Sequence, residues 1–187
     1  WSAAERVFSM CFDHLTAMTA LLLARTPAES FQPAFRECSD LAAICEVLNL
    51  MSLMLAQVQH IATCDRLLAF VMRVDMQHVV QRLCFLAFST SRRQEDEETG
   101  IHDLPQVLWL RTRLLRLFRA LCRASMYVVH KADTAAHTAC RLQVFAMVNA
   151  LLSPEWGVIG RFFFHHGTIL VDLPNKLNVL RLLADFL

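Results

Sequence analysis

The feature that most restricts the fold of this chain is how few residues it contains that favour turns. It has four glycines and five prolines in 187 residues, and none of either between Ala34 and Thr99 or between Gln106 and Ser153. Sheet-rich and α/β folds need frequent turns built from these residues, and soluble domains average roughly 7% glycine. The sequence therefore predicts an all-α fold, a helical array or an irregular bundle of about seven or eight helices.

Residues typical of helix N-caps predict where the helices begin. "SAAE" at 2–5 and "TPAE" at 26–29 put a hydroxyl residue three positions before glutamate, and "SPEW" at 153–156 puts Ser153 before a proline. Asp103, Asp133 and Asp172 are predicted as further caps. The predicted helices are 3–24, 27–37, 40–60, 64–88 with a break around Val74 and Asp75, 104–131, 134–152, 155–165 and 174–187. The only strand-like stretch is "GTILV" at 167–171.

Helices of this length and order resemble the armadillo and HEAT class of helical repeats. The resemblance covers most of the chain and contains no signature residues of that class. The alternative is a single irregular bundle. Several of the predicted helices are apolar on more than one side, as inner helices of either arrangement would be.

The composition is more apolar than a free-standing domain needs. Apolar residues make up 56% of the chain and charged residues 19%, against roughly 45–50% and 25% in soluble domains. We therefore expect one helical domain over 1–187 with apolar surface covered by another copy, a partner protein or the rest of a longer polypeptide. The start at Trp1 and the end at Leu187, inside an apolar pattern, favour a piece of a larger protein.

The net charge and the cysteines limit which partners and which cellular compartment we expect for this chain. The formal net charge of +1 provides no overall field that would attract nucleic acid or an anionic membrane. The seven cysteines show no paired spacing and follow no signal peptide, which predicts reduced thiols in an intracellular protein, nuclear or cytoplasmic. The best candidate for a membrane span, 47–64, is interrupted by polar residues, so no membrane association is expected.

Four arginines form a stripe in "WLRTRLLRLFRALCR", residues 109–123. At 100° per residue, Arg113, Arg116, Arg119 and Arg123 fall within an arc of about 120°, opposite a leucine-rich side. Arg111 lies apart from this stripe. Guanidinium groups in one column fit a carboxylate-rich helix or a phosphate backbone, but an ordinary solvated or internally paired face has the same pattern.

Aromatic residues near the C-terminus are the second candidate element. "EWG" at 155–157 precedes "RFFFHH" at 161–166, and three consecutive phenylalanines point in three directions from a helix. Trp156, Phe162 and Phe163 are therefore predicted as apolar anchors for a partner. The alternative is that these rings hold the C-terminal helix to the protein's own core.

The segment 89–103 differs from the rest of the chain. It has no periodicity, and Arg92 and Arg93 are followed by four consecutive acids from Glu95 to Glu98. It is predicted to be a mobile charged surface loop.

Motifs for catalysis and metal binding are missing from the sequence. Cysteine–histidine pairs three or four residues apart occur at Cys11 and His14, at His60 and Cys64, and at His137 and Cys140, but no close pair of cysteines accompanies them. There is no nucleophile elbow, phosphate loop, zinc-protease motif or dinucleotide fingerprint. We therefore expect no metal, no cofactor and no enzyme.

The function predicted from the sequence is a non-enzymatic interaction or scaffold module. It would bind an amphipathic or acidic helix of another protein, or a second copy of itself, through an apolar surface flanked by the arginine stripe. The alternative is nucleic-acid binding through the same arginines.

Overall fold

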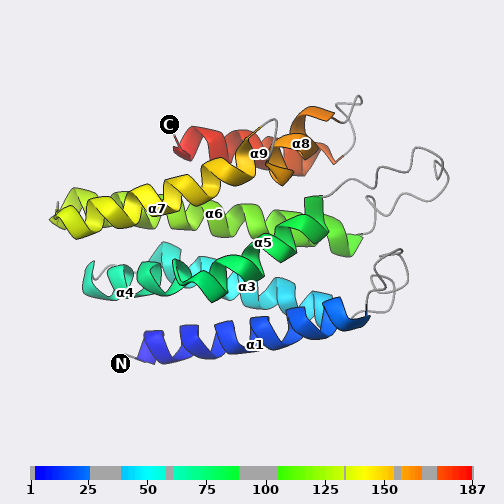
Figure 1. The fold of residues 1–187 in the computed structure, drawn as a ribbon, viewed down its shortest axis with the longest axis horizontal. Helices are drawn as coiled ribbons and strands as arrows, with labels where there is room; N and C mark the ends of the chain where they lie inside the picture. Colours follow the sequence, from blue (N-terminus) through cyan, green and yellow to red (C-terminus); the bar gives the residue numbers. More distant parts are fainter. Residues whose placement is uncertain are drawn as a thin grey trace.

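A computed structural model describes residues 3–25, 39–57, 61–88, 105–132, 134–153, 157–165 and 172–186. These residues form eight α-helices and contain no strand, so the predicted all-α fold is confirmed (Figure 1). The predicted helix at 27–37, the loop at 89–103 and the strand-like stretch at 167–171 lie outside the described residues. The helices are α1 (Ala3–Arg25), α3 (Ser39–Gln57), α4 (Ile61–Val71), α5 (Val74–Phe88), α6 (Pro105–Ala132), α7 (Ala135–Leu152), α8 (Val158–His165) and α9 (Leu173–Phe186).

The break predicted inside 64–88 is confirmed, because α4 ends at Val71 and α5 begins at Val74. At the start of α5, Asp75 accepts a hydrogen bond from the backbone N–H of Met76 and two from the side chain of Arg73. A carboxylate in the first turn also complements the positive end of the helix dipole. These hydrogen bonds of Asp75 stabilise the turn between α4 and α5, which contains no glycine or proline.

Two of the predicted caps can be compared with the ends of α7. Helix α7 is capped by Thr134, whose hydroxyl accepts a hydrogen bond from the backbone N–H of His137, rather than by Asp133. Ser153 is the C-cap of α7, where its backbone N–H donates to the carbonyl of Asn149. The helix start predicted at 155 lies outside the described residues, and the next described helix, α8, begins at Val158.

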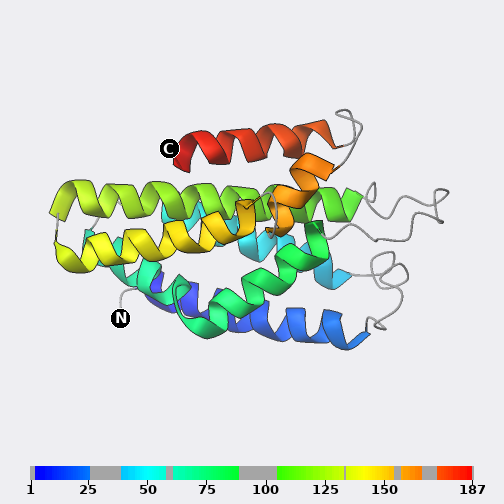
Figure 2. The ribbon, with the colours of Figure 1, turned by 45° about the horizontal axis from the view of Figure 1, so that its top comes forward.

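The helices form two layers (Figures 1 and 2). One layer places α1 beside α3, α3 beside α6 and α6 beside α9, and the other contains α4, α5, α7 and α8. Helix α6 lies at the centre and packs against α3, α4, α5, α7 and α9. Its inner side is fully buried and supplies Leu110, Leu114, Leu117, Phe118 and Leu121 to one continuous apolar core.

The contacts of α6 are compatible with both a helical repeat-like array and a bundle. In a helical repeat protein each unit contacts only its neighbours in sequence. Helix α6 packs against α3 and α9, each three positions away in the order of helices, and stacked units of three helices would give the same contacts. The described structure is therefore an all-helical assembly organised around one central helix.

Candidate functional site

The four predicted arginines do lie on one side of α6, between α3 and α9, but three of them already have partners within the chain. Arg113 donates from Nη1 to Oδ1 of Asn49 at 2.8 Å and lies 3.4 Å from a carboxylate oxygen of Glu46. The side chain of Glu46 is 70% exposed, so this ion pair stabilises the fold little. The contacts nevertheless place the Arg113 guanidinium against α3.

Arg119 and Arg123 both bind Asp185 on α9. Arg119 donates from Nε to one carboxylate oxygen at 2.5 Å, and Arg123 donates from Nη2 to the other at 2.9 Å. Partial burial by itself would raise the pKa of Asp185, but the hydrogen bonds and positive charges of the two arginines outweigh it, and the pKa is lowered. Asp185 therefore links the C-terminal helix to α6.

Replacing Asp185 with asparagine is expected to lower stability at neutral pH but not at low pH. Because the folded-state pKa lies below the unfolded value, the carboxylate contributes stability above about pH 4 and loses that contribution as the pH falls through the lowered pKa. Urea unfolding of the wild type and Asp185→Asn between pH 7 and about pH 2 should show converging stabilities at the acid end. Asp13→Asn on the exposed surface of α1 is the control, and an equal pH-dependent difference there would contradict the explanation.

Arg116 differs from the other three arginines. It is exposed, and within the described part of the chain no hydrogen bond or ion pair engages it. Seven residues earlier, about two helical turns, the indole of Trp109 is 60% exposed. A large exposed aromatic and an unpaired guanidinium on the same side of a helix are residue types enriched at the energetic centres of protein interfaces.

The neighbouring side of α3 adds two exposed leucines. Leu50 follows Asn49 directly and Leu53 lies one turn later, and their side chains are 42% and 48% exposed. Since Asn49 is bound by Arg113, this part of α3 borders the exposed side of α6. We define the α3–α6 face by the five residues Leu50, Leu53, Trp109, Arg113 and Arg116.

Trp109 and the two leucines were missed by the sequence reasoning. Trp109 precedes Arg113 by four residues and Arg116 by seven, so the helical periodicity that identified the arginines also places it in their arc. Leu50 and Leu53 carried no comparable signal, because every other face of α3 is apolar as well and the sequence does not show which face is covered.

The predicted aromatic anchors do not join this face. Trp156 lies outside the described residues. Phe162 is only 1% exposed and contacts Phe88 with ring centroids 5.3 Å apart, so the expectation that it offers a partner surface is not met in a single copy of the chain. Phe163 is half-buried on α8, where its ring centroid lies 5.0 Å from that of Phe164, which is 62% exposed.

Phe162 instead belongs to a buried polar network around Arg111. The Arg111 side chain donates from Nε to the carbonyl of Ala87 at 2.7 Å and from Nη1 to Asp172 at 2.8 Å, and its guanidinium lies 4.6 Å from the centre of the Phe162 ring. Asn175 donates to both carboxylate oxygens of Asp172. These contacts attach α8 and α9 to α5 and α6, which explains why Arg111 lies apart from the stripe.

The described cysteines show no sign of activation. All six of them are unpaired, and burial raises the pKa of each thiol, to about 11 at Cys45, Cys64 and Cys122. A raised pKa leaves almost no thiolate, which is the nucleophilic form, near neutral pH. Within 3–25, 39–57, 61–88 and the later described ranges, no group of three or more histidines, cysteines and acids is arranged to hold a metal ion.

The helices give no candidate for a membrane span. None of those in the described ranges is both long enough and apolar enough to cross a bilayer.

Comparison of the chain with models of protein families, with curated proteins and with solved structures finds no match. The resemblance to armadillo and HEAT repeats therefore depends on helix length and order alone.

Proposed function

We propose that this protein is a non-enzymatic protein–protein interaction module, and that its α3–α6 face binds an acidic amphipathic helix of a partner. The single observation that carries the proposal is the exposure of Trp109 on the same side of α6 as Arg116, which has no partner in the described chain. Exposed single apolar residues are common on protein surfaces and need no explanation. A tryptophan, two leucines and an unpaired arginine on adjoining helices supply both the apolar and the charged part of a docking site.

The charges on this side of the molecule favour an acidic partner. Four arginines of α6 face two carboxylates, Glu46 of α3 and Asp185 of α9, which leaves two positive charges unbalanced. Arg116 carries part of this unbalanced positive charge and has no carboxylate partner among the described residues. A carboxylate on the partner would accept a bidentate hydrogen bond there, and the surrounding charge would exclude basic partners.

The apolar residues favour a helix as the partner element. An amphipathic helix presents anchors at i, i+3, i+4 and i+7 along one stripe, and Trp109, Leu50 and Leu53 offer it contacts from two helices that lie side by side. The raised pKa values of the thiols support the non-enzymatic part of the proposal, because they argue against a cysteine nucleophile. The unpaired cysteines are also in keeping with an intracellular scaffold.

Nucleic-acid binding has less support. A phosphate backbone would need several free cations in a row, whereas Arg119 and Arg123 are already shared by Asp185 and Arg113 is held by α3. Only Arg116 is left without an internal partner in the described part of the molecule. A second copy of the chain is a further possible occupant, and the experiment below distinguishes it.

The test uses a designed amphipathic helical peptide with leucines on one side and glutamates on the other, and a matched peptide with lysines in place of the glutamates. We expect the wild-type protein to bind the acidic peptide and not the basic one. Trp109→Ala should weaken binding about tenfold, the cost of a moderate interface hot spot, and Arg116→Glu about fivefold or more. Fluorescence anisotropy of the labelled peptide measures both.

The control variants are Arg161→Glu, a charge reversal on the exposed surface of α8, and Leu142→Ala, a truncation of an exposed side chain on α7. Losses as large in these controls as in the test variants would refute the location of the site. Tighter binding of a DNA duplex than of the acidic peptide, with steep salt dependence, would support the nucleic-acid alternative instead. A dimer in sedimentation that Trp109→Ala dissociates would identify a second copy as the occupant.

A further inference from the structure

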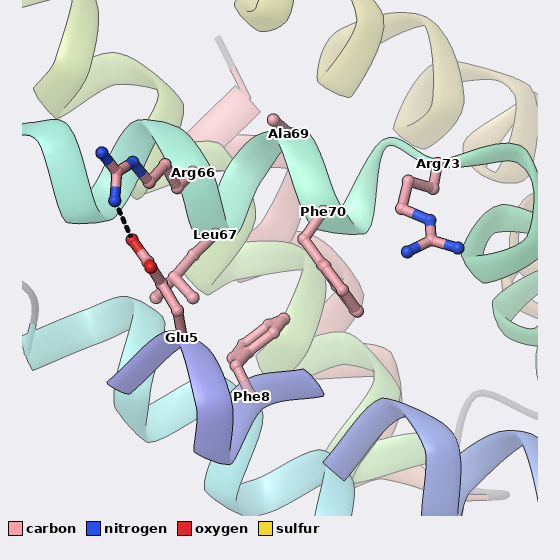
Figure 3. A pocket seen from close by; sticks show the side chains of 7 residues that line it. All are labelled: Glu5, Phe8, Arg66, Leu67, Ala69, Phe70 and Arg73. Atoms are coloured by element: carbon pink, nitrogen blue, oxygen red, sulfur yellow. Dashed lines mark hydrogen bonds and ion pairs between the residues drawn. The ribbon is translucent and has the colours of Figure 1, made fainter. Parts of the chain in front are cut away.

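A pocket opens between α1 and α4, away from the residues of the α3–α6 face. Its volume is about 570 Å³, within the range of about 300–1,000 Å³ that accommodates small organic molecules. Figure 3 shows Glu5 and Phe8 coming from α1, Leu67 and Phe70 reaching toward them from α4, and Arg73 in the turn that follows α4. No feature of the proposed function uses this pocket.

The inner lining of the pocket is apolar. Phe8 and Leu67 are almost fully buried beneath it, and Phe70 forms a wall, with its ring centroid 5.8 Å from that of Phe8 in an edge-to-face arrangement. Phe12 supports Phe70 from behind, with the two ring centroids 5.2 Å apart. Ala69, which is exposed on α4, is the smallest side chain of the lining. These aromatic contacts keep the cavity open because each ring is held by its neighbours.

The rim of the pocket carries an arginine at each of its two ends, and each arginine has an acidic partner. Arg66 lies on α4 and Arg73 lies in the turn between α4 and α5, and their side chains are 64% and 53% exposed. Arg66 donates from Nη1 to the carboxylate of Glu5 at 2.9 Å, and the Glu5 side chain is 8% exposed (Figure 3). The Arg66 end is therefore nearly neutral and carries a carboxylate that repels anions.

The Arg73 end is the better site for an anion. Its guanidinium lies 5.1 Å from the centre of the Phe70 ring, at the edge of the apolar wall. Arg73 uses Nε and Nη2 to bind Asp75, whereas no contact within the described residues occupies its Nη1. Asp75 does not line the pocket, so the cavity itself is bordered by two arginines and one acid.

We propose that this pocket binds a small amphipathic anion, with an apolar body against Phe8, Leu67 and Phe70 and a single carboxylate or sulfonate at Arg73. An apolar cavity with few, well-placed polar groups is the usual form of a ligand site. At the opposite end, the buried carboxylate of Glu5, paired with the exposed Arg66, disfavours a second negative charge. The ligand class is thus a monoanion such as a medium-chain or aromatic carboxylate, and it is selected against cations of the same shape.

The first probe is 8-anilinonaphthalene-1-sulfonate, an aromatic monoanion whose fluorescence rises in apolar surroundings. We expect Ala69→Trp, which enlarges the smallest side chain of the lining, to abolish its binding at one site per chain, and Arg73→Gln to weaken it about fivefold. Arg82→Gln, which removes an exposed arginine from α5, is the matched control and should have no effect. The neutral probe N-phenyl-1-naphthylamine should be lost in Ala69→Trp but unaffected by Arg73→Gln.

Competition between the probe and charged alkyl compounds shows whether the pocket prefers an anionic or a cationic ligand. Dodecanoate should displace the sulfonate probe, whereas dodecyltrimethylammonium, a cation with the same alkyl chain, should not. If circular dichroism shows that Ala69→Trp is unfolded, Ala69→Leu takes its place and must still weaken binding of both probes. Unchanged binding in a folded Ala69 variant, equal losses in Arg73→Gln and Arg82→Gln, or equal displacement by the cation would each overturn the proposal.

Discussion

Replacing Arg111 with methionine is expected to lower the free energy of unfolding by about 3–5 kcal/mol, the cost of breaking a buried ion pair by removing one member. The Arg111 residue is fully buried and the side chain of Asp172 is 2% exposed. Without the guanidinium, the carboxylate of Asp172 would remain buried next to Asn175 and would lose its ion pair with Arg111. The carbonyl of Ala87 would also lose the hydrogen bond it accepts from Arg111.

Thermal and urea unfolding of Arg111→Met measure the loss, and a second substitution separates its cause. Asp172→Asn removes the buried charge, and asparagine tolerates the positive φ of 51° at this position about as well as aspartate does. The double variant Arg111→Met with Asp172→Asn should therefore recover part of the stability that Arg111→Met loses. Arg123→Met, which removes an exposed arginine from the same helix, should cost less than about 1 kcal/mol. A cost that small for Arg111→Met would contradict the role assigned to the network.

Replacing Gly160 with alanine is expected to destabilise the protein by about 2–3 kcal/mol, at the upper end for overpacking. Gly160 lies inside α8, where helix propensity alone would make alanine more stable by about 1 kcal/mol. A Cβ at this position would overlap the backbone carbonyl oxygens of Leu152 and Ser153 at the end of α7. Because those atoms belong to the backbone, no side-chain rotation relieves the overlap.

The sign of the change in the free energy of unfolding shows whether steric overlap or helix propensity dominates at Gly160. Urea unfolding should show Gly160→Ala to be less stable than the wild type, although the substitution favours helix formation. The comparison variant is Ala146→Gly on the exposed surface of α7, which should be destabilised by about 1 kcal/mol from propensity alone. A gain in stability for Gly160→Ala would show that α8 does not pack against the end of α7 as closely as described.

Most of the helix positions were predictable because helix ends depend on local chemistry. The predicted range 104–131 agrees with Pro105–Ala132, and 134–152 agrees with Ala135–Leu152. Ser153 shows what this reasoning leaves out. A hydroxyl residue followed by proline suits the start of a helix, but here Ser153 also ends α7. Gly157 and Gly160 allow α8 to approach the end of α7 closely, which depends on tertiary packing.

Only the part of the candidate site that lies on a single helix, α6, was predictable from the sequence. Helical periodicity placed Arg113, Arg116, Arg119 and Arg123 in one arc and applied equally to Trp109. Which arginines are free depends on residues far along the chain, because the partner Asp185 follows Arg119 by 66 residues. The same holds for Asp172, which follows Arg111 by 61. Pairings at such separations leave no trace in the spacing of a single sequence.

The central position of α6 has a consequence for how the chain is made. Ribosomes add about 5–20 residues per second and release the N-terminal part first, so the last residue of α5, Phe88, precedes the end of α6 at Ala132 by about 2–9 s of synthesis. During that interval the sides of α3 and α4 that pack against α6 in the finished protein lack this covering helix. We therefore expect the first helices to be more prone to aggregation before α6 is complete than afterwards.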